Sequence, residues 1–455
     1  MPAGTTRGST RIGRKILGAV LVVAIVAGAW VALPYIEWRA PAVSVDLAGD
    51  AIGLRPFEVK VSDEGRGLRS VTVDLVTQRG ATRLVERSFP LGELAQSIEV
   101  TTADRAKELA EGDATLRIEA RDYSYWAFSG NTTTVERAVK VDLTAPKAEV
   151  LSRQHYVNFG GSAFVVYRTS EDAVRSGVTI GERFFPGFPA DFGEGAVRVA
   201  WFAHPYDTAR DARPMVIAED AAGNSARAGM HYVLKDRQYR TRTIEVSDTF
   251  IDAKVLPLLP PGFDTTDRAA AYVQVNHDMR RENAQTIVDV CARTDPERLW
   301  DGDFGQLTNS QVEASFADER HYMYGGREIG VEHHLGYDLA VTRHYPIEAA
   351  NRGRVVYAEP LGIYGNTVIL DHGQGIHTLY AHLSSIDVST GGMVEKGDSL
   401  GKSGETGLAG GDHLHYAALV HGVPVLPLEW WDGKWIRDNV ELKIKDAKAE
   451  LAAGR

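Results

Sequence analysis

The stretch between residues 39 and 237 alternates apolar and polar positions in short runs that end in Gly, Asp or Asn turns. A period of two places every second side chain on the same face of a β-strand, so one face can be buried while the other meets water. The clearest such runs are 43–47, 116–120 and 139–143. This part of the chain is therefore predicted to consist of half-buried strands joined by tight turns.

The predicted strands belong to a repeat. Ala40-Pro41 recurs as Ala145-Pro146, an offset of 105 residues, and Ala120-Arg121-Asp122 recurs as Ala218-Glu219-Asp220, an offset of 98 residues. An all-β period of about 100 residues is typical of immunoglobulin-like sandwiches. We therefore expect two immunoglobulin-like domains, at 39–143 and 144–237. Such domains usually act as spacers or as docking surfaces, here for a regulatory protein.

Residues 247–297 change to a helical pattern. Ser247 precedes a short apolar run and has the hydroxyl side chain that favours a helix N-cap. Pro260-Pro261-Gly262 interrupts the pattern, and residues 267–293 then space apolar side chains among charges in a way that suggests a helical hairpin. We interpret the segment as a linker to the domain that follows. A gate over a site in that domain is the alternative.

The N-terminus has a short basic segment followed by a long uncharged, apolar one. Residues 1–15 carry four basic side chains and no acidic one, and residues 16–36 are 21 uncharged, mostly apolar residues. About 20 apolar residues in a helix cross a bilayer, and basic flanks stay cytoplasmic. The pattern predicts a cytoplasmic tail at 1–15 and a single transmembrane anchor at 16–36, with the rest of the chain outside the cytoplasm. A signal peptide cleaved near Ala27-Gly28-Ala29 is the alternative.

Length, composition and charge narrow the class of protein. A chain of 455 residues suggests about three domains, and 44% hydrophobic with 24% charged residues exclude a disordered or collagen-like chain. The net charge of −11 argues against nucleic acid as the main partner, because phosphates need a basic face. The single cysteine, Cys291, excludes a disulfide framework or a cysteine-rich metal cluster, and its apolar neighbours predict that it is buried.

The last third of the chain is enriched in histidine. Ten of the 14 histidines lie between residues 321 and 421, far more than an even spread would place there. Such enrichment in a Gly-rich, strand-like sequence indicates a metal site. His334 precedes Asp338 by four residues, His382 lies in a separate strand-like run, and His413 precedes His415 by two residues. On a strand, the last two imidazoles would point to the same face.

This ensemble suits zinc chemistry better than any single histidine would. Two histidines and one aspartate give zinc three protein ligands and leave the fourth position for water, as in catalytic zinc sites. A histidine pair on one strand face can divide the work, with one imidazole on the metal and the other handling protons or charge. The sequence therefore predicts a hydrolytic zinc site within residues 334–415.

The same motifs resemble those of the LytM/lysostaphin-type zinc endopeptidases, which cut peptide cross-links of bacterial cell walls. The resemblance covers about residues 311–435 and includes the Gly-rich turns Tyr364-Gly365-Asn366, Lys396-Gly397-Asp398 and Gly404-Glu405-Thr406-Gly407. It implies a small antiparallel β-sheet domain, which we place at 300–437, with its site in a groove. Residues 438–455 would be a charged tail.

The resemblance also implies a role for five residues. His334, Asp338 and His415 would bind one zinc ion per chain, and His382 and His413 would be the catalytic histidines beside the metal-bound water. Which of these two takes the proton and which stabilises the oxyanion stays open at this point. The implied substrate is bacterial peptidoglycan. The expected protein is thus multidomain and mainly β, held by a single pass in the inner membrane, with its peptidase domain on the periplasmic side.

Other functions are compatible with the same motifs. The chain could be a non-enzymatic activator of cell-wall amidases, because some members of the family have lost metal ligands and regulate other enzymes. The same zinc chemistry could also act on a protein substrate. A membrane-anchored adhesin or scaffold is a further alternative, but it would leave the histidine cluster unexplained.

Overall fold

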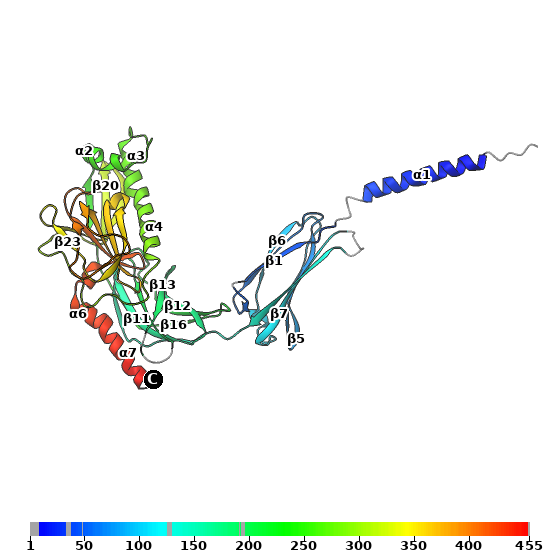
Figure 1. The fold of residues 1–455 in the computed structure, drawn as a ribbon, viewed down its shortest axis with the longest axis horizontal. Helices are drawn as coiled ribbons and strands as arrows, with labels where there is room; N and C mark the ends of the chain where they lie inside the picture. The colour runs from blue at the N-terminus through cyan, green and yellow to red at the C-terminus, as the bar shows by residue number, and fades with distance from the viewer. Residues whose placement is uncertain are drawn as a thin grey trace, which may run out of the picture. The chain divides into compact units, whose positions relative to one another are not determined.

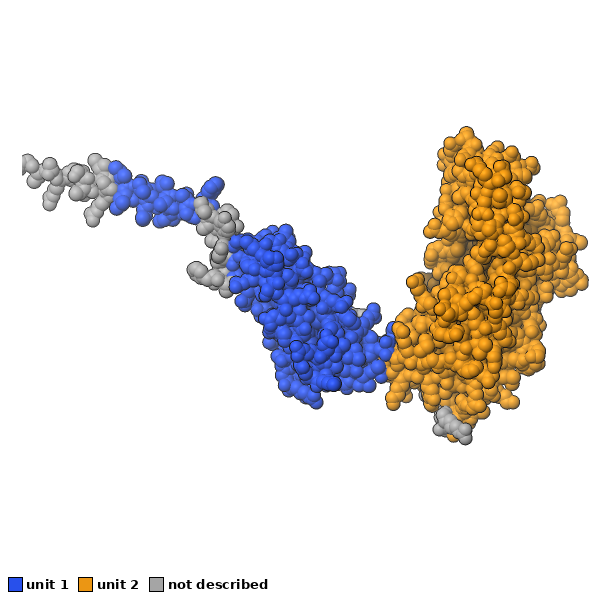
Figure 2. Space-filling model, turned by 180° about the vertical axis from the view of Figure 1, so that it is seen from behind, with its two compact units in different colours: residues 1–145, 219–225 blue, residues 146–218, 226–455 orange. Residues whose placement is uncertain are grey.

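The structure is a computed structural model that describes residues 9–32, 38–47, 49–124, 130–190, 192 and 196–453. The chain divides into two compact units (Figure 2). Unit 1 comprises Met1–Ala145 with Glu219–Ser225, and unit 2 comprises Pro146–Ala218 with Ala226–Arg455. All five residues predicted to form the site lie in unit 2.

Helix α1 spans Ser9–Ala32. Residues 1–8 of the predicted cytoplasmic tail and 33–36 of the predicted anchor lie outside the described residues. In the part of the chain that the structure describes, no helix combines the length and the apolarity needed to cross a membrane. The anchor over residues 16–36 stays a prediction.

Unit 1 has two sheets around one core. The strand orders are β1-β3-β6 and β2-β8-β7-β4-β5. The strands are β1 (Ala42–Asp46), β2 (Ala51–Ile52), β3 (Phe57–Ser62), β4 (Leu68–Thr77), β5 (Gly80–Ser88), β6 (Ala95–Val100), β7 (Gly112–Asp122) and β8 (Thr132–Val141). Burial alternates along them as the sequence predicts, so Phe57, Val59 and Val61 of β3 are buried while their neighbours are not. The immunoglobulin-like assignment of residues 39–143 stays a prediction.

Residues 148–229 of the chain form a single seven-stranded sheet of order β16-β15-β12-β13-β14-β11-β9. The strands are β9 (Ala148–Val150), β11 (Ser162–Thr169), β12 (Ala173–Ile180), β13 (Arg183–Pro189), β14 (Ala196–Ala203), β15 (Met215–Asp220) and β16 (Ser225–Gly229). Beside it, β10 (His155–Asn158) and β17 (Tyr232–Lys235) pair in parallel. The immunoglobulin-like assignment of residues 144–237 stays a prediction.

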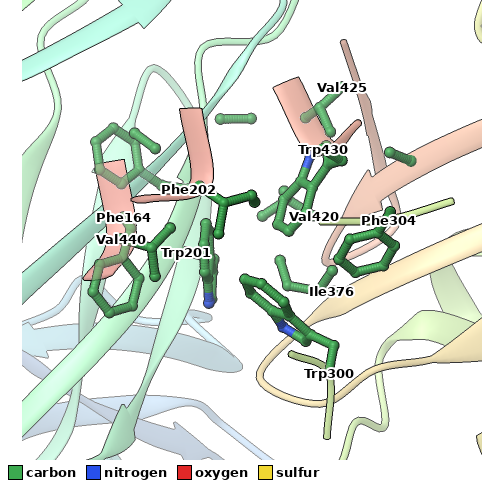
Figure 3. Close-up of a cluster of buried hydrophobic side chains, with 14 of the residues drawn as sticks. Phe164, Trp201, Phe202, Trp300, Phe304, Ile376, Val420, Val425, Trp430 and Val440 are labelled. Carbon is green, nitrogen blue, oxygen red and sulfur yellow. The ribbon is translucent and has the colours of Figure 1, made fainter. Parts of the chain in front are cut away.

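An aromatic core joins this sheet to the domain that follows. Buried side chains of the seven-stranded sheet belong to the same hydrophobic cluster as those of the domain after residue 300. Trp201 of β14 contacts Trp300 and Trp430, with ring centroids 5.9 and 5.1 Å apart (Figure 3). Truncation of one such buried tryptophan costs about 3–5 kcal/mol. Both faces of β11 and β14 are buried, and their buried side chains share one core with the next domain.

The domain after residue 300 is built on an eight-stranded sheet with the path β19-β22-β30-β26-β25-β24-β28, and β31 pairs with β30. The strands are β19 (Gln311–Ala314), β22 (Tyr337–Ala340), β24 (Gly353–Pro360), β25 (Asn366–Asp371), β26 (Ile376–Leu383), β28 (Met393–Val394), β30 (Leu414–Val420) and β31 (Val423–Val425). The pairs of neighbouring strands in this sheet are antiparallel, as the resemblance implies.

Two smaller sheets accompany the eight-stranded sheet. The first has the order β18-β20-β21 and the second the order β23-β29-β27. Their strands are β18 (Thr241–Glu245), β20 (Asp318–Tyr324), β21 (Arg327–His334), β23 (Pro346–Glu348), β27 (Ser385–Ile386) and β29 (Ser399–Lys402). The first sheet ends in His334 and so delivers a predicted ligand to the site.

The two faces of the eight-stranded sheet bury different partners. In β30, Leu414 and Tyr416 point into the aromatic core, whereas Ala417 and Leu419 point into a second cluster formed with the helical segment 248–291. Successive side chains of a strand face opposite ways. His415 therefore lies on the helical side of the sheet, where α3 and α4 run beside the strands (Figure 1).

The helical segment is continuous where the sequence suggested a hairpin over 267–293. The elements are α2 (Asp248–Phe250), η4 (Ile251–Val255), η5 (Leu256–Leu258), α3 (Arg268–Val273), the π-helix η6 (Gln274–Met279) and α4 (Arg280–Cys291), with the short η7 (Gly362–Tyr364) packed nearby. The N-cap prediction is confirmed, because the Ser247 hydroxyl accepts a hydrogen bond from the backbone N–H of Phe250. No Gly or Pro lies between residues 268 and 291 to break the helix, so the hairpin is wrong.

The C-terminal segment is packed and helical rather than a charged tail. The elements are α5 (Pro427–Trp430), α6 (Gly433–Ile436), η8 (Arg437–Glu441) and α7 (Leu442–Ala452). Val440, Ala447 and Leu451 are buried in the aromatic core cluster. Their spacing is that of one helix face, a signal that the charges of residues 438–453 obscured. Residues 454–455 lie outside the described part of the chain.

Candidate metal centre

Three predicted ligands meet where three strands come together. His334 ends β21, Asp338 lies on β22, and His415 lies on β30, directly opposite Asp338 in the antiparallel register. The Nε2 atom of His334 is 2.9 Å from Oδ1 of Asp338 and 3.0 Å from Nδ1 of His415, which is itself 3.0 Å from the same oxygen. Sheet pairing thus brings residues 77 and 81 positions apart into one cluster.

The donor set of this cluster fits zinc. Tetrahedral ligands at ~2.0–2.1 Å from a zinc ion lie about 3.3 Å from one another, close to the triangle formed by the three atoms. The Nδ1–H of His334 donates to the carbonyl of Ser315. In this tautomer Nε2 carries a free lone pair, which points into the cluster. Such a backbone partner commonly orients a metal-binding histidine. Two imidazole lone pairs and a carboxylate held this close favour a shared cation.

The backbone at Gly336 allows this arrangement. A Cβ atom at that position would lie 2.6 Å from Nε2 of His415, closer than real Cβ contacts. Only a glycine therefore lets the loop between His334 and Asp338 pass the imidazole without moving it.

The two predicted catalytic histidines line the same site. His413 directly precedes β30 and forms an isolated antiparallel bridge with Gly404, and its Nε2 lies 3.4 Å from Oδ1 of Asp338. His382, near the end of β26, lies with its ring centroid 4.9 Å from that of His413. Each uses Nδ1–H to donate to a backbone carbonyl, so each keeps Nε2 as an acceptor.

The backbone of His382 adopts an unusual conformation that is typical of active-site residues. Its φ of +62° lies in the left-handed region, which is uncommon for a residue with a side chain. Such conformations cost of order 1–3 kcal/mol and cluster at active sites. The strain is held in place by the hydrogen bond of the imidazole to the carbonyl of Thr406, 2.8 Å long.

Burial and neighbours set the protonation of the site. Burial would raise the pKa of Asp338, but the imidazoles of His334, His413 and His415 around it hold this pKa well below its usual range. Burial lowers the pKa of His415 to about 4 and moves the pKa of His382 well below its ordinary value. Burial also opposes charge on His413, but the neighbouring carboxylate of Asp338 raises its pKa. A carboxylate beside neutral His382 and His415 suits cation binding and proton acceptance.

A cavity of about 120 Å³ joins these groups. Its lining is His334, Asp338, His382, His413, His415, Arg280, Arg320, Ile363, Tyr364, Leu408, Ala409 and Gly410. The structure therefore brings all five predicted residues together. Sequence reasoning missed the two arginines, because each stands among ordinary surface charges of its own segment and only the fold aims it at the cavity.

Other candidate side chains lie apart from this cavity. His372 and His377 are fully buried, and burial lowers the pKa of each to about 4. His421 stacks on Phe188 with 5.8 Å between ring centroids. Cys291 is buried, as predicted, and burial raises the pKa of its thiol, so it is no nucleophile.

Comparison with known proteins places the site in a known family. Residues 332–427 match peptidase family M23. This region is 40% identical over 95 residues to the DD-carboxypeptidase/endopeptidase Mpg of Neisseria meningitidis, covering 21% of this chain and 22% of that protein. It is 40% identical over 92 residues to the peptidoglycan DD-endopeptidase ShyA of Vibrio cholerae, covering 20% and 21%. The matches thus span about a fifth of the length of these relatives.

A solved structure is also similar. The crystal structure of a putative peptidase M23 from Pseudomonas aeruginosa aligns with 62% of this chain and 96% of its own, at 20% identity and a TM-score of 0.37. The family match contains His334, Asp338, His382, His413 and His415. Residues 332–427 of the chain therefore belong to a peptidase M23 domain, of the LytM/lysostaphin type.

Proposed function

We propose that this chain is a zinc-dependent endopeptidase that hydrolyses peptide cross-links of bacterial peptidoglycan. The observation that carries the proposal is the convergence of His334 Nε2, Asp338 Oδ1 and His415 Nδ1 to within about 3 Å of one another in an M23 domain. The names of the relatives point to the D,D type of cross-link. The match covers only about a fifth of each of these proteins. The substrate of this chain is therefore part of the proposal.

His334, Asp338 and His415 would hold one zinc ion. When bound, zinc supplies a positive charge that polarises a carbonyl and lowers the pKa of water toward neutrality. The residues of the chain then provide the proton chemistry. His382 and His413 present Nε2 acceptors at the cavity, so one can take a proton from water and return it to the leaving amine. The other, once protonated, can stabilise the oxyanion.

The fixed Nδ1–H bonds of these two histidines have a mechanistic purpose. They hold each ring in one tautomer and one orientation before substrate arrives. The rings do not need to reorganise during the reaction, which favours catalysis. The same hydrogen bonds are present on both rings, so the division of roles between His382 and His413 is tested by mutation.

The test of the proposed function uses isolated peptidoglycan. We expect the purified, zinc-loaded chain to convert cross-linked muropeptides into uncross-linked ones, identified by mass, and to lose this activity when 1,10-phenanthroline removes the metal. Added zinc should restore the activity. Products that keep their cross-links, or cleavage that continues in metal-free protein, would contradict the proposal.

We also propose that the domain acts outside the cytoplasm, on the periplasmic side of the inner membrane, because its proposed substrate lies there. A reporter fused after Arg455 should then be active only if it folds outside the cytoplasm, as a phosphatase that needs disulfides does. A reporter that is active only in the cytoplasm would contradict this location. Docking of a regulatory protein on the immunoglobulin-like domains predicted at 39–143 and 144–237 stays a prediction.

A further inference from the structure

Two arginines enter the cavity from outside the family match. Arg280 comes from the start of α4 and Arg320 from β20, whereas the M23 match begins at residue 332. Their side chains are only 20% and 19% exposed. Buried guanidinium groups need anionic partners, because desolvation of an unpaired charge is costly.

Arg320 has such a partner within the chain. Its Nη2 donates to Oδ2 of Asp338 at 3.2 Å, while Oδ1 of the same carboxylate faces the three imidazoles. Arg320 thus binds the carboxylate oxygen of Asp338 that is turned away from the metal cluster. It acts as a positioning residue for Asp338, and its charge is balanced by that carboxylate.

Arg280 is held differently. Its Nε donates to the carbonyl of Asn276 at 2.9 Å and its Nη2 to Oδ1 of the same residue at 2.7 Å. Among the described residues, Nη1 makes no hydrogen bond, and the nearest carboxylate, Glu332, is 3.9 Å from Nε. That carboxylate also accepts a hydrogen bond from His277 at 2.7 Å. Arg280 therefore keeps charge and donor capacity for a further anion.

The helix that carries Arg280 is fixed to the wall of the cavity. Oδ1 of Asn283 accepts a hydrogen bond from the backbone N–H of Ile363 at 2.9 Å, and Gly362 passes so close that a Cβ would lie 2.4 Å from Asn283. The π-helix Gln274–Met279 directly precedes Arg280. Such π-helical turns frequently occur at functional sites.

From this placement, we propose that Arg280 binds a carboxylate of the substrate that lies next to the scissile amide. The site would then prefer cross-links that carry a carboxylate beside the cleaved bond over neutral links such as a glycine bridge. The proposal rests on the proposed endopeptidase function and specifies its substrate class. A charge-assisted hydrogen bond to a carboxylate in a partly buried site favours the acidic substrate by roughly 10- to 100-fold.

The test compares two peptide probes. Both carry a ketomethylene group in place of the scissile amide, so neither can be hydrolysed, and they differ only in a carboxylate or a carboxamide on the neighbouring carbon. We expect the zinc-loaded full chain to bind the carboxylate probe roughly 10- to 100-fold more tightly in calorimetry. Arg280→Gln should remove this preference and leave the affinity for the carboxamide probe unchanged, whereas Arg280→Lys should retain part of it.

Arg352→Gln is the matched control. Arg352 is half-exposed, pairs with Glu395 at 3.1 Å and does not line the cavity, so its loss should leave the preference intact. Zinc content and melting temperature should match in all variants. Equal binding of the two probes by the unmodified chain, binding of neither probe, or a preference that persists in Arg280→Gln would each overturn the proposal.

A parallel assay with the hydrolysable amides separates this inference from the proposed function. A carboxylate preference without any hydrolysis would support the role of Arg280 and contradict the endopeptidase. Hydrolysis of both amides at equal rates would support the endopeptidase and overturn the role of Arg280.

Discussion

The substitution His415→Ala should leave the purified chain with little zinc and no activity, and His334→Ala and Asp338→Ala should do the same. Two remaining protein ligands cannot hold the tetrahedral ion firmly. His413→Ala and His382→Ala should instead keep close to one zinc ion per chain and lose roughly 10²–10⁴ in rate, because they remove proton transfer or oxyanion stabilisation. Elemental analysis after dialysis and release of cross-link fragments measure the two effects.

The control for this series is His231→Ala. His231 is exposed and does not line the cavity, so its loss should change neither zinc content nor rate. If His413→Ala loses zinc while His415→Ala keeps it, the two roles on this strand are reversed. If both variants keep zinc and full activity, the reaction takes place elsewhere and the proposed function fails.

A chain that begins at Trp300 should not fold into a stable domain. Such a truncation removes the helical segment whose buried side chains cover one face of the eight-stranded sheet: Ile251, Val255, Ala271, Tyr272, Val275, Ile287 and Cys291. Burial of each larger apolar side chain contributes about 1.5–3 kcal/mol, and several such losses exceed the stability of about 5–15 kcal/mol typical of a protein. Thermal unfolding followed by circular dichroism should show no cooperative transition.

Two point substitutions support the same conclusion within the full chain. Tyr272→Ala should lower the free energy of unfolding by about 3–5 kcal/mol, because it empties a buried aromatic site. Val288→Ala, on the same helix but 42% exposed, should change it by no more than about 0.5 kcal/mol. A truncated chain that keeps a native melting transition and cuts peptidoglycan faster would instead identify the segment as a removable gate.

The helical segment illustrates how far sequence patterns reach. Its helical character and the Ser247 cap follow from local rules, since N-capping and apolar spacing act within a few residues. The hairpin prediction failed because a pattern of apolar residues does not specify where a helix turns back. Whether the segment acts as a spacer or covers the sheet was not local information either. It depended on the apolar face of a sheet whose strands lie between residues 353 and 420.

The strands at 148–229 show a similar limit of local patterns. The pattern predicted strands there, but it carries no information about what covers their faces. Trp201 packs against Phe164 of the same sheet and against Trp300 and Trp430 of the next domain. The same applies to residues 438–453, where the abundance of charge hid the helix face that includes Val440, Ala447 and Leu451.

The sequence by itself determined the candidate ligands and the chemistry that they suit. His413 and His415 stand two residues apart, so strand geometry alone directs their side chains to one face. The resemblance to the LytM/lysostaphin-type enzymes then implied that His334, Asp338 and His415 bind the metal. Only the tertiary structure decided that Arg280 and Arg320 line the same cavity, because a helix and a separate sheet far from those motifs deliver them. A partly buried charge is costly unless it is paired. Each arginine in the cavity therefore needs an anionic partner.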